Sequence, residues 1–354
     1  MKNWWYGTLT VILILTFAIS GCRTNGNGSV VEGTQVVTDG VEPKATMVPT
    51  ETPLPTETPQ PSLVVLYAPG SVGEQIAAAW QERIATLAQT DGFAFEMRTT
   101  VTEEEITENW QIVVMPGYED SLPSLAASAP NTLFVVVTDA TLPDLPTNVV
   151  QMVADPYAKA FAAGNTAIHT AADWRLGALL PGDSNNDSNL IQSAFINGVN
   201  YYCGKCGTAY TPLFDAPLIT TLPTSSSGEA WIEVISELHR QYILRAVFVS
   251  EAASSQELFT FLAEINMIVV GEQKPAGIEG LRWAGTIRQD SLAVFEENWT
   301  KFVSRNYVSN IIPVPIEVVD VNEDLLSTGR IRMIEETIDA VADGWVLPLS
   351  PDYP

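Results

Sequence analysis

The sequence predicts an α/β protein with two lobes, each built from a parallel β-sheet flanked by helices, and a cleft between them. Short apolar runs alternate with longer stretches whose apolar residues recur at helical spacing, which is typical of βαβ units. This alternation occurs twice, in halves of similar size, between residues 62 and 285. The segments after residue 285 mix both patterns, so the two lobes can share them.

The first half begins with a strand of uninterrupted apolar residues at 63–67, the pattern of a strand buried on both faces in a parallel sheet. Later runs of the same kind are bounded by Pro-Gly or Thr-Asp pairs, and the stretches between them have helical periodicity. Strands are expected at 63–67, 95–101, 112–115, 132–137 and 149–153, and helices at 76–87, 122–127 and 155–170.

The second half repeats the pattern, and the tail adds further elements. Strands are expected at 176–180, 246–249, 267–270 and 314–319, and helices at 190–195, 231–238, 258–265, 292–302 and 334–341. Gly198 and Gly344 are expected to end the helices that precede them. We expect lobe one at about 62–172, lobe two at about 173–285, and crossing and shared segments at 286–354.

The N-terminal segment has the composition of a secretory signal. Lys2 is followed by an apolar stretch at 9–19, the small residues Ser20 and Gly21, and then Cys22. The stretch is shorter than the roughly 20 residues of a transmembrane helix. The Ile-Ser-Gly-Cys sequence resembles the lipobox of bacterial lipoproteins, which implies that 1–21 is removed and that Cys22 is lipidated. An uncleaved signal anchor with a chance cysteine is the alternative.

Residues 22–61 form a linker between this anchor and the lobes. The linker is rich in Gly, Asn and Ser at first and then in Pro, Thr and Glu, so it cannot build a core. We expect it to hold residues 62–354 away from the membrane, on the extracytoplasmic side of the cell.

The charge balance is strongly acidic, with 42 Asp and Glu residues against 17 Lys and Arg residues. A net charge of -25 excludes the basic surface with which nucleic-acid-binding proteins neutralise phosphates. It also disfavours adsorption to anionic lipid headgroups. Membrane contact is therefore expected through the lipid anchor alone.

The three cysteines leave one pair after lipidation of Cys22, namely Cys203 and Cys206. A redox Cys-x-x-Cys motif would open a helix after a strand, whereas this pair follows an expected helix. A zinc site would need further ligands nearby. A small loop disulfide is the interpretation that an exported protein favours.

Polar residues that follow the expected strands are the candidate ligand contacts, because ligands bind outside the carboxyl ends of the strands in open parallel sheets. Tyr118 could stack on a ring, and Asp183 and Glu272 could accept hydrogen bonds from hydroxyl groups. Pro-Gly pairs at these ends can equally be ordinary turns. The candidates are Ser71, Tyr118, Asp139, Asp183, Glu251, Glu272 and Arg288.

Sequence motifs of catalysis are absent from the chain. It contains no Gly-x-Ser-x-Gly elbow, no His-Glu-x-x-His and no Walker loop. We therefore expect a binding protein without catalytic residues, cofactor or metal. A hydrolytic enzyme is the weaker alternative, since no nucleophile and base can be paired from the sequence.

Four stretches of the chain carry a further similarity, namely ASAPNTLFVVV at 127–137, DPYAKAFAAGNTA at 155–167, FINGVNYYCGKC at 195–206 and IEETIDAVADGWVLP at 334–348. Together they resemble the basic membrane protein family of bacterial lipoproteins, and the likeness covers most of the chain after Ser62. This family has the type 1 periplasmic-binding-protein-like architecture. Its members are receptors for ABC importers, and several bind purine nucleosides.

The resemblance implies a cleft that stacks a base and holds a ribose. Glu272 stands where the family has an acidic residue, and Arg288 stands where it has a lysine. The family's motif after the first strand falls at 68–73, where this chain instead has Ala-Pro-Gly-Ser-Val-Gly. We expect a solute-binding lipoprotein that takes a small polar ligand, with a nucleoside as the implied example, and that works with an ABC permease. A surface sensor without a transporter is the alternative.

The lipid anchor is tested by the substitution Cys22→Ala. We expect the variant to be released from the membrane or to remain as an unprocessed precursor, because the thiol that carries the lipid is gone. Cell fractionation and immunoblotting measure this. Ligand affinity should stay unchanged, and a loss of affinity would make the tether part of the binding site.

Overall fold

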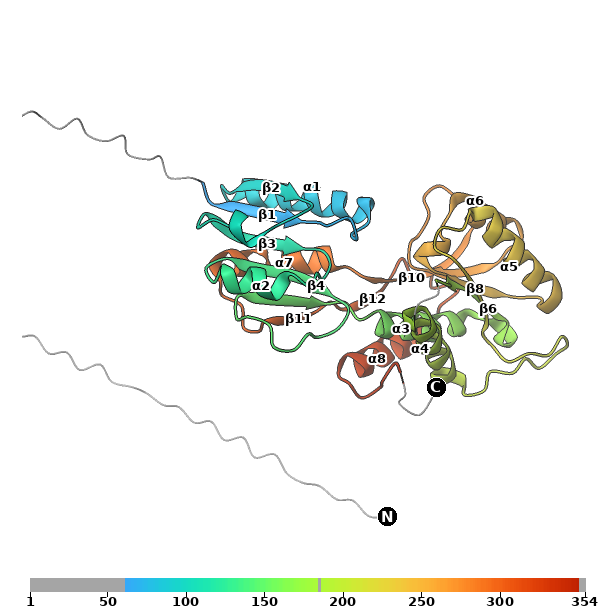
Figure 1. Ribbon diagram of the computed structural model, residues 1–354. Helices are drawn as coiled ribbons and strands as arrows, with labels where there is room; N and C mark the ends of the chain where they lie inside the picture. The colour runs from blue at the N-terminus through green and yellow to red at the C-terminus, as the bar shows by residue number, and fades with distance from the viewer. Residues whose placement is uncertain (1–60, 184–185, 350–354) are drawn as a thin grey trace, which may run out of the picture. The chain divides into compact units, whose positions relative to one another are not determined.

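Two six-stranded sheets organise the computed structural model, which describes residues 61–183 and 186–349 (Figure 1). These residues belong to one compact unit of the chain. The strand orders are β11-β5-β4-β3-β1-β2 in the first sheet and β12-β10-β9-β8-β6-β7 in the second. Each sheet forms the centre of one lobe. Every helix in this part of the chain is too short or too polar to cross a membrane.

Lobe one is built on a wholly parallel sheet with helices on both faces. The helices α1 (Glu74–Thr90) and α7 (Ser291–Ser304) pack on one face, and α2 (Leu122–Ser128) packs on the other. The strands are β1 (Leu63–Tyr67), β2 (Ala94–Arg98), β3 (Trp110–Met115), β4 (Leu133–Thr138), β5 (Val149–Val153) and β11 (Ile311–Pro313).

Lobe two repeats this plan with one antiparallel edge, where β12 pairs with β10. The helices α3 (Pro156–Thr170), α4 (Asn186–Cys203) and α8 (Thr328–Ala342) cover one face. The helices α5 (Gly228–Tyr242) and α6 (Gln256–Glu264) cover the other. The strands are β6 (Leu176–Pro181), β7 (Leu218–Leu222), β8 (Ala246–Val249), β9 (Ile268–Gly271), β10 (Arg282–Gln289) and β12 (Ile316–Val319).

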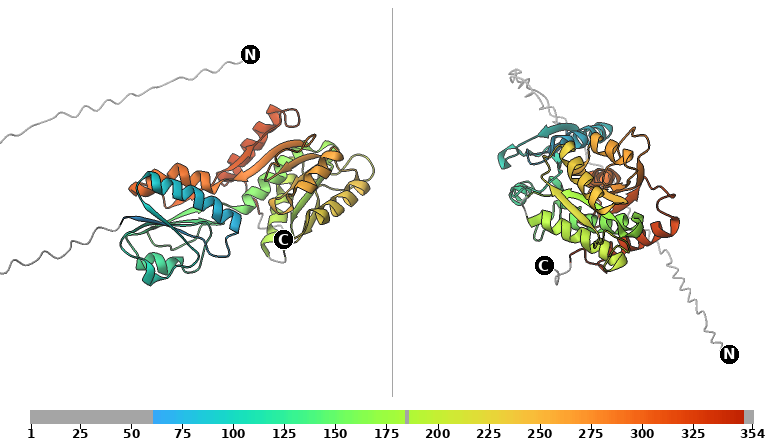
Figure 2. Two further views of the ribbon diagram at one scale, coloured as in Figure 1. Left: turned by 90° about the horizontal axis from the view of Figure 1, so that it is seen from above. Right: turned by 90° about the vertical axis from the view of Figure 1, so that its right-hand side faces the viewer.

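The described chain passes between the lobes at three places, namely from β5 to α3, from β10 to α7 and from β11 to β12 (Figures 1 and 2). The expected boundary at residue 172 has to be corrected. Helix α3 packs against α4, α8 and the second sheet, so lobe two already begins at Pro156. The helix pattern was visible in the sequence, but only packing shows to which sheet a helix belongs.

Three strands, β7, β10 and β11, were not predicted. Strands β7 and β11 lie at the edge of their sheets, and every residue of β7 is only half-buried. Strand β10 lies inside the second sheet, but its sequence RWAGTIRQ interrupts the apolar residues with charged residues, Gly and Thr. An edge strand lacks the continuous apolar run of a central one, so its sequence signal is weak. The strand expected at 314–319 corresponds to β12, and β11 precedes it as a separate strand of the other sheet. Pro313 and Pro315 flank the separation, and proline cannot donate a ladder hydrogen bond.

Helices α3 and α4 pack at very close range through two glycines. A Cβ atom on Gly164 would lie 2.1 Å from the carbonyl oxygen of Phe195, and one on Gly198 would lie 1.9 Å from that of Phe161. Helix α4 therefore does not end at Gly198 but continues to Cys203. The glycine was interpreted as a helix stop because its packing role is invisible in one helix alone.

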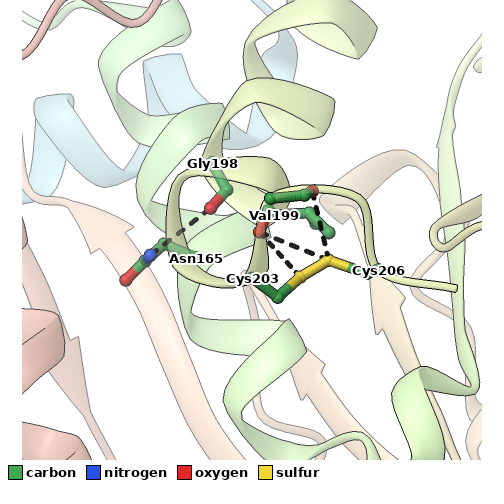
Figure 3. The surroundings of a disulfide bond; sticks show 6 residues. Asn165, Gly198, Val199, Cys203 and Cys206 are labelled. Carbon is green, nitrogen blue, oxygen red and sulfur yellow. Dashed lines mark hydrogen bonds between the residues drawn. A yellow bond between two sulfur atoms is a disulfide. The ribbon is translucent and has the colours of Figure 1, made fainter.

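The end of α4 is joined to the following loop by a disulfide between Cys203 and Cys206 (Figure 3). Gly198 precedes Cys203 in α4, and its carbonyl oxygen accepts a hydrogen bond of 3.3 Å from Nδ2 of Asn165 in α3. The disulfide thus lies directly after the segment of α4 that is pressed against α3.

The glycine contact is tested by Gly198→Ala. In an open helix interior this change stabilises, by about 1 kcal/mol. Here the added methyl group meets backbone, so we expect a net loss of about 1–3 kcal/mol in the free energy of unfolding. Urea denaturation measures the difference. Gly329→Ala in α8 is the matched control, because no described residue beyond its chain neighbours and its own helix backbone comes within 4 Å of its Cβ position. Equal stability of the two variants would contradict the close contact.

Candidate functional site

A cavity of about 490 Å³ lies between the lobes, at the carboxyl ends of their central strands. Lobe one contributes α1 and the ends of β3 and β4, and lobe two contributes the start of α3 and the segments after β8 and β9. The crossing from β10 to α7 closes one side. The lining residues are Ile76, Ala79, Trp80, Pro116, Val137, Lys159, Glu251, Glu272, Gln273, Ile287, Arg288, Gln289, Asp290, Ser291 and Leu292.

A second cavity of about 350 Å³ adjoins it inside lobe two. Its walls come from α3, α4 and the ends of β6 and β8, and they are largely apolar. Lys159, Glu251 and Glu272 line both cavities. These three residues therefore mark the place where the interlobe cavity meets the lobe-two cavity.

Glu272 is held by two interactions at this junction. Its Oε1 lies 3.0 Å from Nζ of Lys159, and its Oε2 accepts a hydrogen bond of 2.7 Å from the backbone N–H of Glu251. The side chains of Lys159 and Glu272 are 27% and 17% exposed, so water screens the pair only in part. Glu272 therefore fixes the loop after β8 and the Lys159 ammonium group in one arrangement.

Lys159 reaches the junction because of how α3 begins. Asp155 caps the helix by accepting hydrogen bonds from the backbone N–H groups of Tyr157 and Ala158, and Pro156 takes the first helical position. A cation one turn from a helix N-terminus is unfavourable in the field of the helix dipole. Glu272 offsets this cost. The unusual position of a lysine was the signal in the sequence that could have identified it.

The surroundings of Lys159 are acidic. Desolvation, followed by the charges of Asp187 and Asp155, raises the pKa of Asp139 above its usual value, and Lys159 acts in the opposite direction. Tyr157 donates a hydrogen bond of 3.2 Å to Asp187. Desolvation and then this bond raise the pKa of the Tyr157 hydroxyl. The start of α3 is therefore surrounded by carboxylates that repel each other.

Three of the predicted residues, Glu251, Glu272 and Arg288, line the interlobe cavity. Glu251 is exposed, and its carboxylate makes no hydrogen bond to a described residue. Arg288 forms an ion pair of 2.8 Å with Glu317 and lies 3.9 Å from Asp290. The Glu317 carboxylate raises the pKa of this guanidinium. The carboxylate of Glu251 is thus the group most free to meet a ligand.

The other predicted residues are not among those that line either cavity. Ser71 donates a hydrogen bond of 2.7 Å to Glu119, and Tyr118 is 40% exposed. Asp183 accepts a hydrogen bond of 3.2 Å from the backbone N–H of Thr224, which itself lines the lobe-two cavity. A ligand role for Ser71, Tyr118, Asp139 and Asp183 stays a prediction.

Sequence reasoning missed Trp80 and Ser250, besides Lys159. Trp80 is 5% exposed and packs edge-on against Phe295, with one side toward the interlobe cavity. Its place in the helical pattern indicated a core residue only. Ser250 follows β8 directly, is 4% exposed and lines the lobe-two cavity. The position after a strand was its signal, but Glu251 was selected there instead.

No protein-family model and no curated protein sequence matches the chain. Several solved structures are similar in fold. An ABC transporter solute-binding protein from Conexibacter woesei DSM 14684 has a TM-score of 0.58 and 13% identity, over 82% of this chain and 99% of that one. Another ABC transporter solute-binding protein, from Aeropyrum pernix K1, has a TM-score of 0.57 and 13% identity, over 83% of this chain and 94% of that one. A transcriptional activator of the comK gene from Bacillus halodurans has a TM-score of 0.55 and 10% identity, over 81% of this chain and 100% of that one.

These similarities confirm the predicted fold, and at such identities they show the fold alone. The chain has the two-lobed α/β architecture of type 1 periplasmic binding proteins, with a parallel-dominated sheet in each lobe. The narrower resemblance to the basic membrane protein family stays a prediction.

The role of Glu272 at the junction is tested by Glu272→Ala. The change leaves a partly buried ammonium group and a backbone N–H without their acceptor, so we expect a loss of about 1–3 kcal/mol in the free energy of unfolding. Thermal and urea denaturation measure it. The control Arg332→Ala breaks an ion pair of 3.5 Å whose partners are 74% and 68% exposed, and it should cost less than about 0.5 kcal/mol. Similar losses of unfolding free energy in both variants would show that the Lys159–Glu272 pair stabilises the protein no more than an exposed ion pair does.

Proposed function

We propose that the protein is an extracytoplasmic solute-binding lipoprotein, which captures a small polar ligand between its lobes and delivers it to an ABC permease. The observation that carries this proposal is the cavity of about 490 Å³ that both lobes and a crossing segment line together. Its size falls within the range of small-molecule sites. The fold similarity to ABC transporter solute-binding proteins supports it.

Binding would act through the crossing segments. A ligand that contacts α1 in lobe one and the segments after β8 and β9 in lobe two stabilises those arrangements in which both sets of residues reach it. Residues 289–292 line the cavity and also connect the lobes. A permease could therefore recognise the loaded protein by the relative position of its lobes.

The chemistry of the lining suits a ligand with several hydrogen-bonding groups. Glu251 offers a free carboxylate, Gln273 offers a side-chain amide, and Lys159 offers those ammonium protons that Glu272 does not use. Trp80 provides an apolar wall. A nucleoside, the ligand implied by the family resemblance, would match this combination of an aromatic contact and polar groups for a ribose.

Lipidation of Cys22 and the linker 22–61 complete the proposal. A tether keeps the binding unit near a membrane partner and raises its effective concentration there. The acidic net charge keeps the unit off anionic lipid surfaces, so the acyl chains would supply the attachment.

A surface sensor without a transporter is the second candidate. The observation that favours it is the similar fold of the transcriptional activator from Bacillus halodurans, which shows that this architecture is not confined to transport proteins. Genes for a permease and an ATPase beside this one would support the importer. Their absence would support the sensor.

The proposed function is tested by ligand-dependent thermal stability of the purified protein. Nucleosides, sugars and amino acids are screened, and native mass spectrometry identifies any molecule that co-purifies. A true ligand at about ten times its Kd should raise Tm by about 2–4 °C, because it binds only the native state. Glu251→Ala should abolish the shift.

The matched control is Glu335→Ala, an exposed carboxylate on α8 that lines neither cavity. This variant should keep the full shift of Tm. A complete screen without any shift, together with a protein that carries no co-purifying molecule, would contradict a solute-binding function.

A further inference from the structure

We propose that the lobe-two cavity is a subsite for an apolar, ring-sized group, so that the ligand is an amphipathic alcohol or amine rather than an anion. This inference rests on the proposed function, because it names the chemical class that the binding protein takes. Three features of the described residues support it: the apolar floor of the cavity, one buried hydroxyl and the charges at the junction.

The floor of the cavity is made by buried apolar side chains. Phe195 of α4 and Phe248 of β8 are 0% and 2% exposed, and their ring centroids are 5.1 Å apart. Leu180 of β6 and Ile191 of α4 extend this surface, and Pro156 and Ala160 of α3 close it. Water gains few hydrogen bonds on such a surface, so an apolar group that displaces it is favoured.

Ser250 is a lining residue of this cavity with one buried polar side-chain atom. The residue lines the cavity and is 4% exposed, and its Oγ has no hydrogen-bond partner among the described residues. The loop after β8 is held through the main chain at this residue, since Ser254 Oγ donates a hydrogen bond of 3.0 Å to the backbone carbonyl oxygen of Ser250. Buried hydroxyl groups are normally paired. A ligand atom that donates to or accepts from Oγ would complete the site.

The junction decides the charge of the ligand's polar end. Lys159 is already bound to Glu272, and Glu251 stands beside them. Close by, desolvation and then the charges of Asp187 and Asp155 raise the pKa of Asp139, so the surroundings of Lys159 hold an excess of carboxylates. Arg288 is occupied by Glu317 and Asp290. An anion would meet this excess of carboxylates, whereas a hydroxyl or ammonium group can bond to them.

The three features point to one molecule that spans both cavities. Its ring would lie against Phe195 and Phe248 and its polar end would face Glu251 in the interlobe cavity. Glu272 would act as a positioning residue that holds Lys159 and the Glu251 backbone, since both of its oxygen atoms are engaged. The sequence prediction had assigned Glu272 to direct contact with ligand hydroxyls.

The test compares three probes that share a phenyl ring and a short arm, namely 2-phenylethylamine, 2-phenylethanol and phenylacetate. Isothermal titration and thermal shift are measured on the purified chain. The amine and the alcohol should bind and raise Tm, and phenylacetate should bind at least about tenfold more weakly.

Ser250→Ala should weaken the amine and the alcohol by about tenfold, the effect of one hydrogen bond. It should leave the Tm of the unliganded protein unchanged or raise it, because no described residue bonds to the hydroxyl that is removed. Ser304→Ala, an exposed serine on α7 outside both cavities, is the matched control. It should alter neither binding nor stability.

The inference is overturned if phenylacetate binds as tightly as the amine, or if Ser250→Ala leaves affinity unchanged. It is also overturned, while the proposed function stands, if a sugar or nucleoside raises Tm and the amine and alcohol do not. If none of the probes and none of the broad panel binds, both proposals fail together.

Discussion

The close crossing of α3 and α4 is the contact on which the candidate site depends. Gly164 and Gly198 let the two helices approach until backbone meets backbone. Phe195, whose carbonyl oxygen faces Gly164, also forms the floor of the lobe-two cavity. Lys159 lies on α3 a little before Gly164 and reaches the junction of the two cavities. A wider helix spacing would move the cavity floor and its charged rim apart.

Electrostatics shapes the same region in a second way. A lysine near the start of α3 opposes the helix dipole, and the ion pair with Glu272 offsets this cost. The carboxylates around Lys159 make the electrostatic potential at the junction negative. An excess of carboxylates is expected anywhere on a chain with a net charge of -25. What distinguishes the junction is that Glu251 and Glu272 border an apolar cavity lined also by Ser250, whose hydroxyl has no partner among the described residues.

Much of the fold was predictable from local pattern. The central strands β1, β3, β4, β6 and β8 are buried along nearly their whole length, so each reads as an apolar run. Edge strands β7 and β11, and the interior strand β10 with its interrupted apolar run, were missed. The site was predictable only in part, because the rule about strand ends names a location and not a side chain. Glu251, Glu272 and Arg288 line the cavity, but Ser71 and Asp183 are engaged elsewhere.

The sequence by itself determined the α/β class, the repetition of two lobes and the acidic character of the surface, since these follow from local periodicity and composition. Tertiary structure decided three further points. It placed α3 with the second sheet, it turned Gly198 from an expected helix stop into a helix contact, and it brought Lys159 to Glu272. Each of these depends on which surfaces meet in space. Periodicity along one chain describes a single element at a time, so it cannot contain that information.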